Sequence, residues 1–272
     1  MINSFFNQIK ILTGAFVVLV TLISPSSLNA SNDGYTSTTL ITGANRGIGF
    51  EFAKQYLSKG WKVIATCRKP ESADQLILLQ EKFPTLLIID RLDVTDHSQI
   101  DQLAEKYAAT PIDVLLNNAG ISGDTKNQIF GRMNYDVYEK VLAVNTIGPL
   151  KMAEAFYPHV KASKQKKIIT VSSSEGSIAT ADKRGGGRLF FYRSSKSALN
   201  MVMVNLALQL KNRGVAVGMI NPGATDTDFM TGLPFPLRKT EVAVSDMIRN
   251  IDSITVENTG AYLNYNGKTV PW

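Results

Sequence analysis

Residues 40–51 read Leu-Ile-Thr-Gly-Ala-Asn-Arg-Gly-Ile-Gly-Phe-Glu, with glycines at positions 43, 47 and 49. The β-branched and apolar residues 38–42 predict a buried strand before these glycines. Apolar residues at helical spacing from Phe52 to Leu57 predict a helix after them. The helix N-terminus of such a βαβ unit directs free N–H groups at an anion. Glycines are needed in the turn because a Cβ would hold a pyrophosphate away from the backbone.

The composition suits one α/β domain. The chain has 272 residues, 44% of them hydrophobic, and 29 Lys and Arg against 23 Asp and Glu give a formal net charge of +6. No aromatic residues interleave with the one basic run, at residues 161–167, so we expect no nucleic-acid partner. With a single cysteine, two histidines and no zinc-binding motif, we expect no metal site.

The first 30 residues have the pattern of an export signal. Lys10 ends a short positive region, residues 11–23 are almost all apolar, and small residues precede Ala30. The apolar run is shorter than the roughly 20 residues of a transmembrane helix. We therefore expect cleavage after Ala30 and a periplasmic or secreted protein. An uncleaved membrane anchor ranks second and a cytoplasmic protein third, and residues 31–37 are interpreted as a polar linker.

Strands and helices alternate over residues 38–272, which predicts a single domain with a Rossmann-type doubly wound parallel sheet and helices on both faces. The seven expected strands are 38–42, 62–66, 86–89, 112–116, 167–171, 215–220 and 261–263. Besides the helix after the glycine turn, we expect helices at 73–82, 96–108, 136–160, 192–213 and 242–251. Ligands of such sheets bind beyond the carboxyl ends of the strands, where the glycine turn lies.

Tyr192 and Lys196 are four residues apart at the start of a predicted helix, so they share one face. A free tyrosine has a pKa of about 10 and is a poor acid or base at neutral pH. A neighbouring ammonium favours the phenolate and lowers that pKa towards the range of general acid–base catalysis. A serine at the end of the fifth strand could donate a hydrogen bond to a carbonyl oxygen beside the tyrosine. Alone, such a Tyr–Lys pair is usually an exposed pair on a helix.

Together, the glycine turn, Asn-Asn-Ala-Gly at residues 117–120, the serine run and the Tyr–Lys pair resemble the short-chain dehydrogenase/reductase family over about residues 38–272. Residues 192–200 and 262–272 are similar to C-factor and sniffer-type carbonyl reductases. The resemblance implies that Tyr192 is the general acid/base and that Lys196 lowers its pKa and holds the nicotinamide ribose. It also implies that Asn145, a polar residue in an apolar helix, joins a water-linked proton relay.

The resemblance also assigns the catalytic serine and the cofactor contacts. Ser173 is implied as the catalytic serine because residues 173–176 match the family's Ser-x-x-Gly register, with Ser172 and Ser174 as alternatives. Besides Tyr192 and Lys196, the implied cofactor contacts are Gly43, Arg46, Ile48, Gly49, Asp93, Val94, Asn118, Ala119, Gly120, Pro222, Gly223, Thr225 and Thr227.

The end of the second strand favours NADP(H) over NAD(H). Enzymes that take NAD carry an acidic side chain there, which accepts hydrogen bonds from the ribose 2′-OH. Here the corresponding residue is Cys67, and Arg68 follows it. Arg46 in the glycine turn could converge with Arg68 on the 2′-phosphate, because guanidinium groups form paired, charge-assisted hydrogen bonds. The competing interpretation is that both are ordinary exposed arginines.

The resemblance implies an enzyme that reduces an aldehyde or ketone to an alcohol, or the reverse, and that forms a homodimer or homotetramer. The alternative is a cofactor-binding extracellular signalling protein of C-factor type with little or no turnover; an interaction module ranks third. The loop at residues 182–188 could recognise an acidic group or be a solvated insertion. An apolar flap could cover the substrate, formed by Phe229, Met230, Leu233, Phe235 and Pro236.

Overall fold

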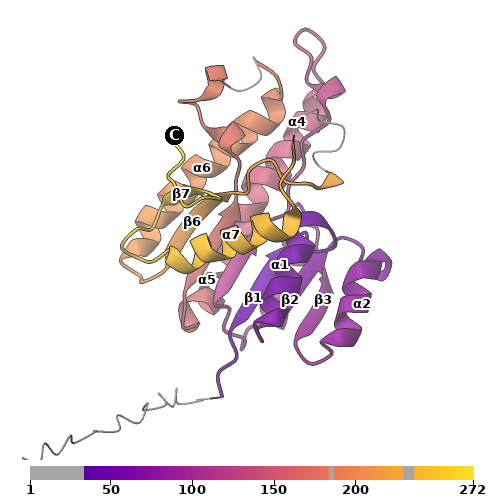
Figure 1. Ribbon diagram of the computed structural model, residues 1–272, viewed down its shortest axis with the longest axis vertical. Helices are drawn as coiled ribbons and strands as arrows, with labels where there is room; N and C mark the ends of the chain where they lie inside the picture. Colours follow the sequence, from indigo (N-terminus) through magenta and orange to yellow (C-terminus); the bar gives the residue numbers. More distant parts are fainter. Residues whose placement is uncertain (1–33, 184–186, 229–235) are drawn as a thin grey trace, which may run out of the picture. The chain divides into compact units, whose positions relative to one another are not determined.

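The computed structural model describes residues 34–183, 187–228 and 236–272, which include one compact unit, Thr36–Trp272 (Figure 1). The export signal and the anchor expected within residues 1–30 lie outside the described residues. So do residues 31–33, residues 184–186 of the loop at residues 182–188, and the flap residues Phe229, Met230, Leu233 and Phe235. No helix among the described residues has the length and apolar character needed to cross a membrane.

One parallel sheet organises the described residues, with seven strands in the order β3-β2-β1-β4-β5-β6-β7. The order reverses between the neighbouring strands β1 and β4, and ligand sites of such sheets lie at the carboxyl ends of the strands at this point. The predicted doubly wound fold is confirmed. The strands are β1 (Thr38–Thr42), β2 (Lys62–Cys67), β3 (Leu87–Arg91), β4 (Val114–Asn117), β5 (Lys167–Val171), β6 (Ala216–Asn221) and β7 (Ala261–Asn264).

Helices cover both faces of this sheet. The α-helices are α1 (Gly47–Ser58), α2 (Asp74–Lys82), α3 (His97–Lys106), α4 (Tyr135–Leu142), α5 (Gly148–Ala162), α6 (Phe190–Lys211) and α7 (Thr240–Ser253). One apolar core joins the sheet to α3, α5 and α6, and includes Phe156 and Leu199. The other joins it to α1, α2 and α7, which include Phe52 and Met247, and α1 and α7 lie side by side (Figure 1). Burying each such side chain stabilises the fold by about 1.5–3 kcal/mol.

The predicted helix over residues 136–160 is in fact three segments. Between α4 and α5 the backbone forms one π-helical turn, η3 (Ala143–Ile147). A π turn inserts an extra residue into the helical repeat, and such turns are frequent at functional sites. The spacing of the apolar residues did not indicate this insertion, which is a feature of the backbone.

Candidate active site

The glycine turn leaves the start of α1 open to an anion. Gly43 and Gly47 have φ values of +67° and +55°, which favour glycine. A Cβ on Gly49 would lie 2.3 Å from the carbonyl oxygen of Gly43, so no side chain fits there. Arg46, at the N-cap of α1, makes no capping hydrogen bond with its side chain. The first N–H groups of this helix therefore have no side-chain acceptor from their own N-cap, as an anion-binding helix N-terminus requires.

The end of β4 is held against this turn by two polar side chains. The Asn118 amide donates to the carbonyl oxygens of Thr42 and Gly43, at 2.9 and 3.1 Å. The Thr42 hydroxyl accepts from the backbone N–H groups of Asn118 and Ala119, at 3.0 and 3.1 Å. Thr42 was not predicted as a site residue, although a polar residue at the end of an apolar strand is a signal of one. Ile48, also expected to contact the cofactor, packs partly buried against the apolar core beneath α1.

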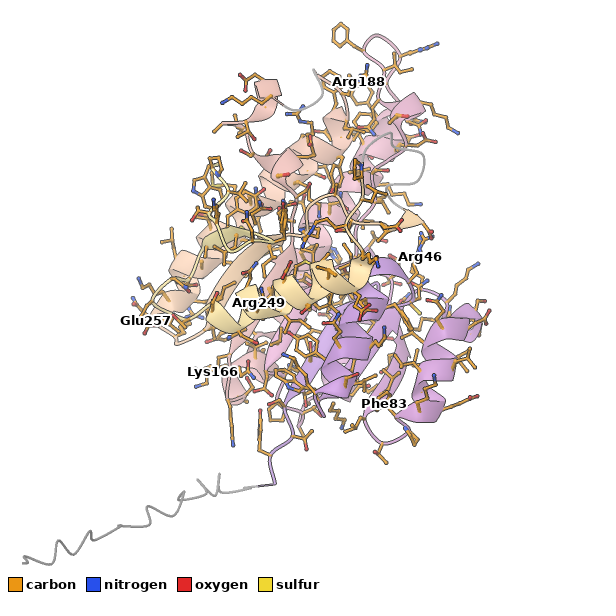
Figure 2. All side chains as sticks on the ribbon, in the orientation of Figure 1. Arg46, Phe83, Lys166, Arg188, Arg249 and Glu257 are labelled. Carbon is orange, nitrogen blue, oxygen red and sulfur yellow. The ribbon has the colours of Figure 1, made fainter. Side chains whose placement is uncertain are left out.

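The two arginines expected to bind a phosphate are both exposed. Arg46, labelled in Figure 2, lies near the start of α1, and its Nη1 is 2.9 Å from Oδ2 of Asp228. An ion pair this exposed contributes little to stability, so it leaves Arg46 available to another anion. Arg68 follows Cys67, whose side chain is buried at the end of β2. Burial raises the pKa of the Cys67 thiol, so the thiol is neutral and does not repel a phosphate.

Two residues after β3, Asp93 and Val94, were expected to contact the cofactor. In the structure Asp93 stabilises a turn and Val94 packs against α5. The Asp93 carboxylate accepts from the Thr95 backbone N–H at 3.0 Å and from its hydroxyl at 2.7 Å. Val94 is buried, and its carbonyl oxygen would lie 2.9 Å from a Cβ on Gly148. The start of α5 therefore fits closely against this segment.

The loop after β6 closes the same edge of the sheet. Gly223 has a φ of +73°, and the buried Thr225 hydroxyl donates to the carbonyl oxygens of Pro222 and Gly223 at 3.2 and 3.3 Å. The Thr227 methyl group would lie 3.3 Å from a Cβ on Gly47. Cofactor residues expected from β1, β4 and β6 thus gather around the glycine turn.

Ser173 and Ser172 differ in where their side chains lie. Ser173 caps the short helix η4 (Ser174–Gly176), and its Oγ accepts from the Glu175 backbone N–H at 3.2 Å. The Ser172 hydroxyl is buried and donates to the Asn200 side chain at 2.6 Å. Only Ser173 of these two is hydrogen-bonded through its side chain to the tyrosine of α6.

Tyr192 and Lys196 lie one turn apart on α6 and both are buried. Lys196 Nζ donates to the Val171 carbonyl oxygen at 2.9 Å and lies 5.8 Å from the centre of the Tyr192 ring. Burial raises the pKa of Tyr192 to about 12, against the opposing effect of a side-chain hydrogen bond with Ser173. Burial also lowers the pKa of Lys196 to about 8. The expected lowering of the Tyr192 pKa is therefore not seen in the protein alone, because desolvation of the phenolate outweighs the other effects.

Asn145 lies in the π turn η3 and is fully buried. Its Oδ1 accepts from the Ile121 N–H at 2.9 Å, and its Nδ2 donates to the Ile121 carbonyl and to Ser195 Oγ, at 2.8 and 2.9 Å. A Cβ on Gly120 would lie 3.4 Å from this Oδ1 and 3.8 Å from Lys196 Nζ. Asn145 and Gly120 therefore lie beside Lys196, the lysine of the Tyr–Lys pair.

A contact from the C-terminal part of the chain, which was not predicted from the sequence, holds the backbone of Ser173 in place. The Tyr262 hydroxyl on β7 donates to the Ser173 carbonyl oxygen. The Tyr262 ring lies 5.3 Å from the Trp272 ring, and the Trp272 carbonyl accepts from the Ala179 N–H at 2.6 Å. Residues 262–272 thus contact both ends of residues 173–179, which follow β5.

A cavity of about 470 Å³ adjoins this segment without including the Tyr–Lys pair. Glu175, Arg188 and Arg193 lie in its wall together with Ile178 and Phe190. The Arg193 Nε is 3.6 Å from Glu175 Oε2. Within the described part of the chain, no group of three or more His, Cys, Asp and Glu side chains could hold a metal ion.

Comparison with known proteins gives one matching family model and three informative relatives. A family model described as short chain dehydrogenase matches residues 37–234. The NADPH-bound carbonyl reductase from chicken fatty liver has a TM-score of 0.80 and 31% identity, covering 87% of this chain and 99% of that one. The carbonyl reductase Sniffer of D. melanogaster has a TM-score of 0.78 and 26% identity, covering 88% and 100%. C-signal of Myxococcus xanthus is 33% identical over 169 residues, which are 62% of this chain and 98% of C-signal.

Proposed function

Because this chain belongs to the short-chain dehydrogenase family, as its sequence resemblance implied, we propose that it is an NADP(H)-dependent oxidoreductase that interconverts a carbonyl compound and an alcohol. One observation carries the proposal: Tyr192 is hydrogen-bonded to Ser173, with Lys196 one turn further along the same helix. This arrangement lies at the edge of the sheet that holds the glycine turn, where a dinucleotide would bind.

The residues present fit NADP(H). The glycine turn leaves no room for a Cβ at Gly49, and the N-cap side chain of α1 leaves the helix start uncapped. Arg46 and Arg68 are exposed beside a strand end that carries the neutral Cys67 in place of an acid, which suits a 2′-phosphate. The NADPH bound to the chicken carbonyl reductase supports the same choice. When bound, the cofactor supplies or accepts the hydride.

In carbonyl reduction, residues of the chain donate the proton that the substrate oxygen receives. With a pKa of about 12, Tyr192 is protonated at neutral pH and donates its proton to the substrate's carbonyl oxygen, which becomes the hydroxyl of the alcohol and leaves Tyr192 as the phenolate. The Ser173 hydroxyl donates a hydrogen bond to that oxygen and afterwards to the phenolate. Lys196 adds a positive charge beside the phenolate, and Asn145 lies where a water-linked relay could return the proton to Tyr192. In alcohol oxidation the same groups act in the opposite order.

A screen of aldehydes and ketones with NADPH and NADH tests the proposal on the purified protein. Tyr192→Phe should bind NADPH yet lose about 10²–10⁴ in turnover, the usual contribution of a general acid. Ser173→Ala should also lose activity, whereas Ser174→Ala, one residue along, serves as the matched control and should lose much less. Native turnover by Tyr192→Phe would refute the assigned mechanism.

The second candidate is a cofactor-binding signalling protein, which the similarity to C-signal favours. Such a protein would bind NADPH and show no turnover with any compound in the screen, and Tyr192→Phe would leave its signalling unchanged. We further propose that the chain forms a homodimer or homotetramer, which sedimentation equilibrium measures directly.

A further inference from the structure

The amino edge of the sheet carries more basic than acidic residues. We define the amino edge as the segments that run from the last residue of each helix to the first residue of the next strand: 58–62, 82–87, 106–114, 162–167, 211–216 and 253–261. These segments hold two acidic residues, Glu257 and the buried Asp113. Their nine basic residues are Lys59, Lys62, Lys82, Lys106, Lys164, Lys166, Lys167, Lys211 and Arg213. Of these, Lys167 is buried, and Lys59 and Lys106 form ion pairs with Asp252 and Asp90, which lie just outside the segments.

The carboxyl edge is nearly balanced by comparison. By sequence, the segments from each strand's last residue to the first residue of the next α-helix, namely 42–47, 67–74, 91–97, 117–135, 171–190 and 221–240, hold eleven basic and nine acidic residues. The helix dipole favours a lysine at a helix C-terminus, which explains Lys82, Lys106 and Lys211. It does not explain the basic residues that lie beyond the helix ends, such as Lys164 and Arg213.

The basic residues surround the point where the chain enters β1. The Asp113 carboxylate accepts from the Thr38 N–H at 2.9 Å and from the Lys164 N–H at 3.2 Å. On the other side, the Lys62 N–H donates to the Ser37 carbonyl at 2.9 Å. Two basic residues, of which Lys164 is exposed, therefore flank the start of the domain.

Further basic residues of the amino edge and of the end of α5 lie near the start of β6. The Arg213 guanidinium and the Lys161 amine lie 5.7 and 5.9 Å from the centre of the same ring, that of Tyr157. The Lys166 carbonyl accepts from the Ala216 N–H at 2.9 Å, which joins the loops before β5 and β6. Figure 2 shows Lys166 towards the lower end of the domain and Arg188, of the carboxyl edge, at the upper end.

We propose that the amino edge docks on a membrane surface rich in anionic lipids. Clusters of lysine and arginine bind such surfaces through the negative charge of the headgroups. Residues 11–23 are apolar, and the twelve residues 24–35 that separate them from the domain can span at most about 40 Å. If the first 30 residues are retained as the membrane anchor, which is the alternative to the expected cleavage, the amino edge stays within reach of the headgroups of the bilayer that the apolar run enters. The carboxyl edge, with the candidate active site, would face away from the lipid.

Vesicle sedimentation of the full chain tests this proposal. Vesicles of phosphatidylcholine alone are compared with vesicles that also contain phosphatidylglycerol, so that insertion of the apolar run is the same in both. The native protein should bind the anionic vesicles more tightly. The variant Lys164→Gln/Lys166→Gln/Arg213→Gln should lose on the order of 100-fold of that preference, since each basic residue near the surface contributes about fivefold.

The matched control removes three basic residues from the carboxyl edge, as Lys126→Gln/Arg132→Gln/Lys183→Gln, and should bind like the native protein. Equal binding of the native protein to both kinds of vesicle would overturn the proposal, as would an equal loss in both triple variants. Retention on duplex DNA that the amino-edge variant alone loses, with no lipid preference, would assign the surface to nucleic acid instead. None of these measurements depends on the proposed oxidoreductase activity.

Discussion

Replacing Lys196 by methionine should change how the stability of the protein depends on pH. Burial lowers the pKa of Lys196 from 10.5 to about 8. Below pH 8 the lysine is charged in both states, so the folded state carries the full cost of burying an ammonium. Between pH 8 and 10.5 the folded protein binds fewer protons than the unfolded chain, so stability rises with pH. A shift of this size corresponds to about 3 kcal/mol.

The measurement is urea unfolding, followed by circular dichroism, of the native protein and Lys196→Met from pH 7 to 10.5. Taking the difference between the two proteins cancels the titrating groups that do not contact Lys196. Tyr192, which lies beside it, stays protonated in the folded state over this range because its pKa is raised to about 12. The free energy of unfolding of the native protein, relative to the variant, should rise by about 3 kcal/mol over this range. A difference that does not change with pH would show that the amine is hydrated in the folded state.

Three further outcomes are expected. Steady-state kinetics should show a preference for NADPH that shifts towards NADH in Cys67→Asp/Arg68→Ala, and a native preference for NADH would contradict the cofactor assignment. Mass spectrometry of the protein from its own cell should find a mature N-terminus at Ser31; an intact Met1 on membrane-bound protein would support the anchor, and on soluble protein would refute export. Gly49→Ala should fold poorly, because its Cβ would lie 2.3 Å from a carbonyl oxygen, and a native melting temperature would contradict that geometry.

The parts of the site that lie within about ten residues of one another were predictable. The glycine turn and the Tyr192–Lys196 pair are short patterns whose spacing fixes their geometry once the local element is known. The doubly wound sheet was also predictable, because it follows from the alternation of strands and helices.

What was missed depends on contacts between distant segments or on burial. The ion pair of Arg46 with Asp228 joins residues 182 positions apart, and no local pattern indicates it. The raised pKa of Tyr192 arises from the packing of several elements around it, so the neighbouring Lys196 alone predicted the wrong direction. The π turn at Asn145 is a feature of the backbone that the spacing of the apolar residues did not indicate.

The bond from Tyr262 to Ser173 has a consequence for the order in which the site is completed. The ribosome makes the strand that ends beside Ser173 long before it makes Tyr262, which is 89 residues further along. At usual rates of synthesis this delay is roughly 4–18 s. During that time the nascent chain can form the glycine turn and pair β1 with β2, while the serine segment has no brace from β7. Cofactor binding and catalytic competence should therefore arise in that order on the growing chain.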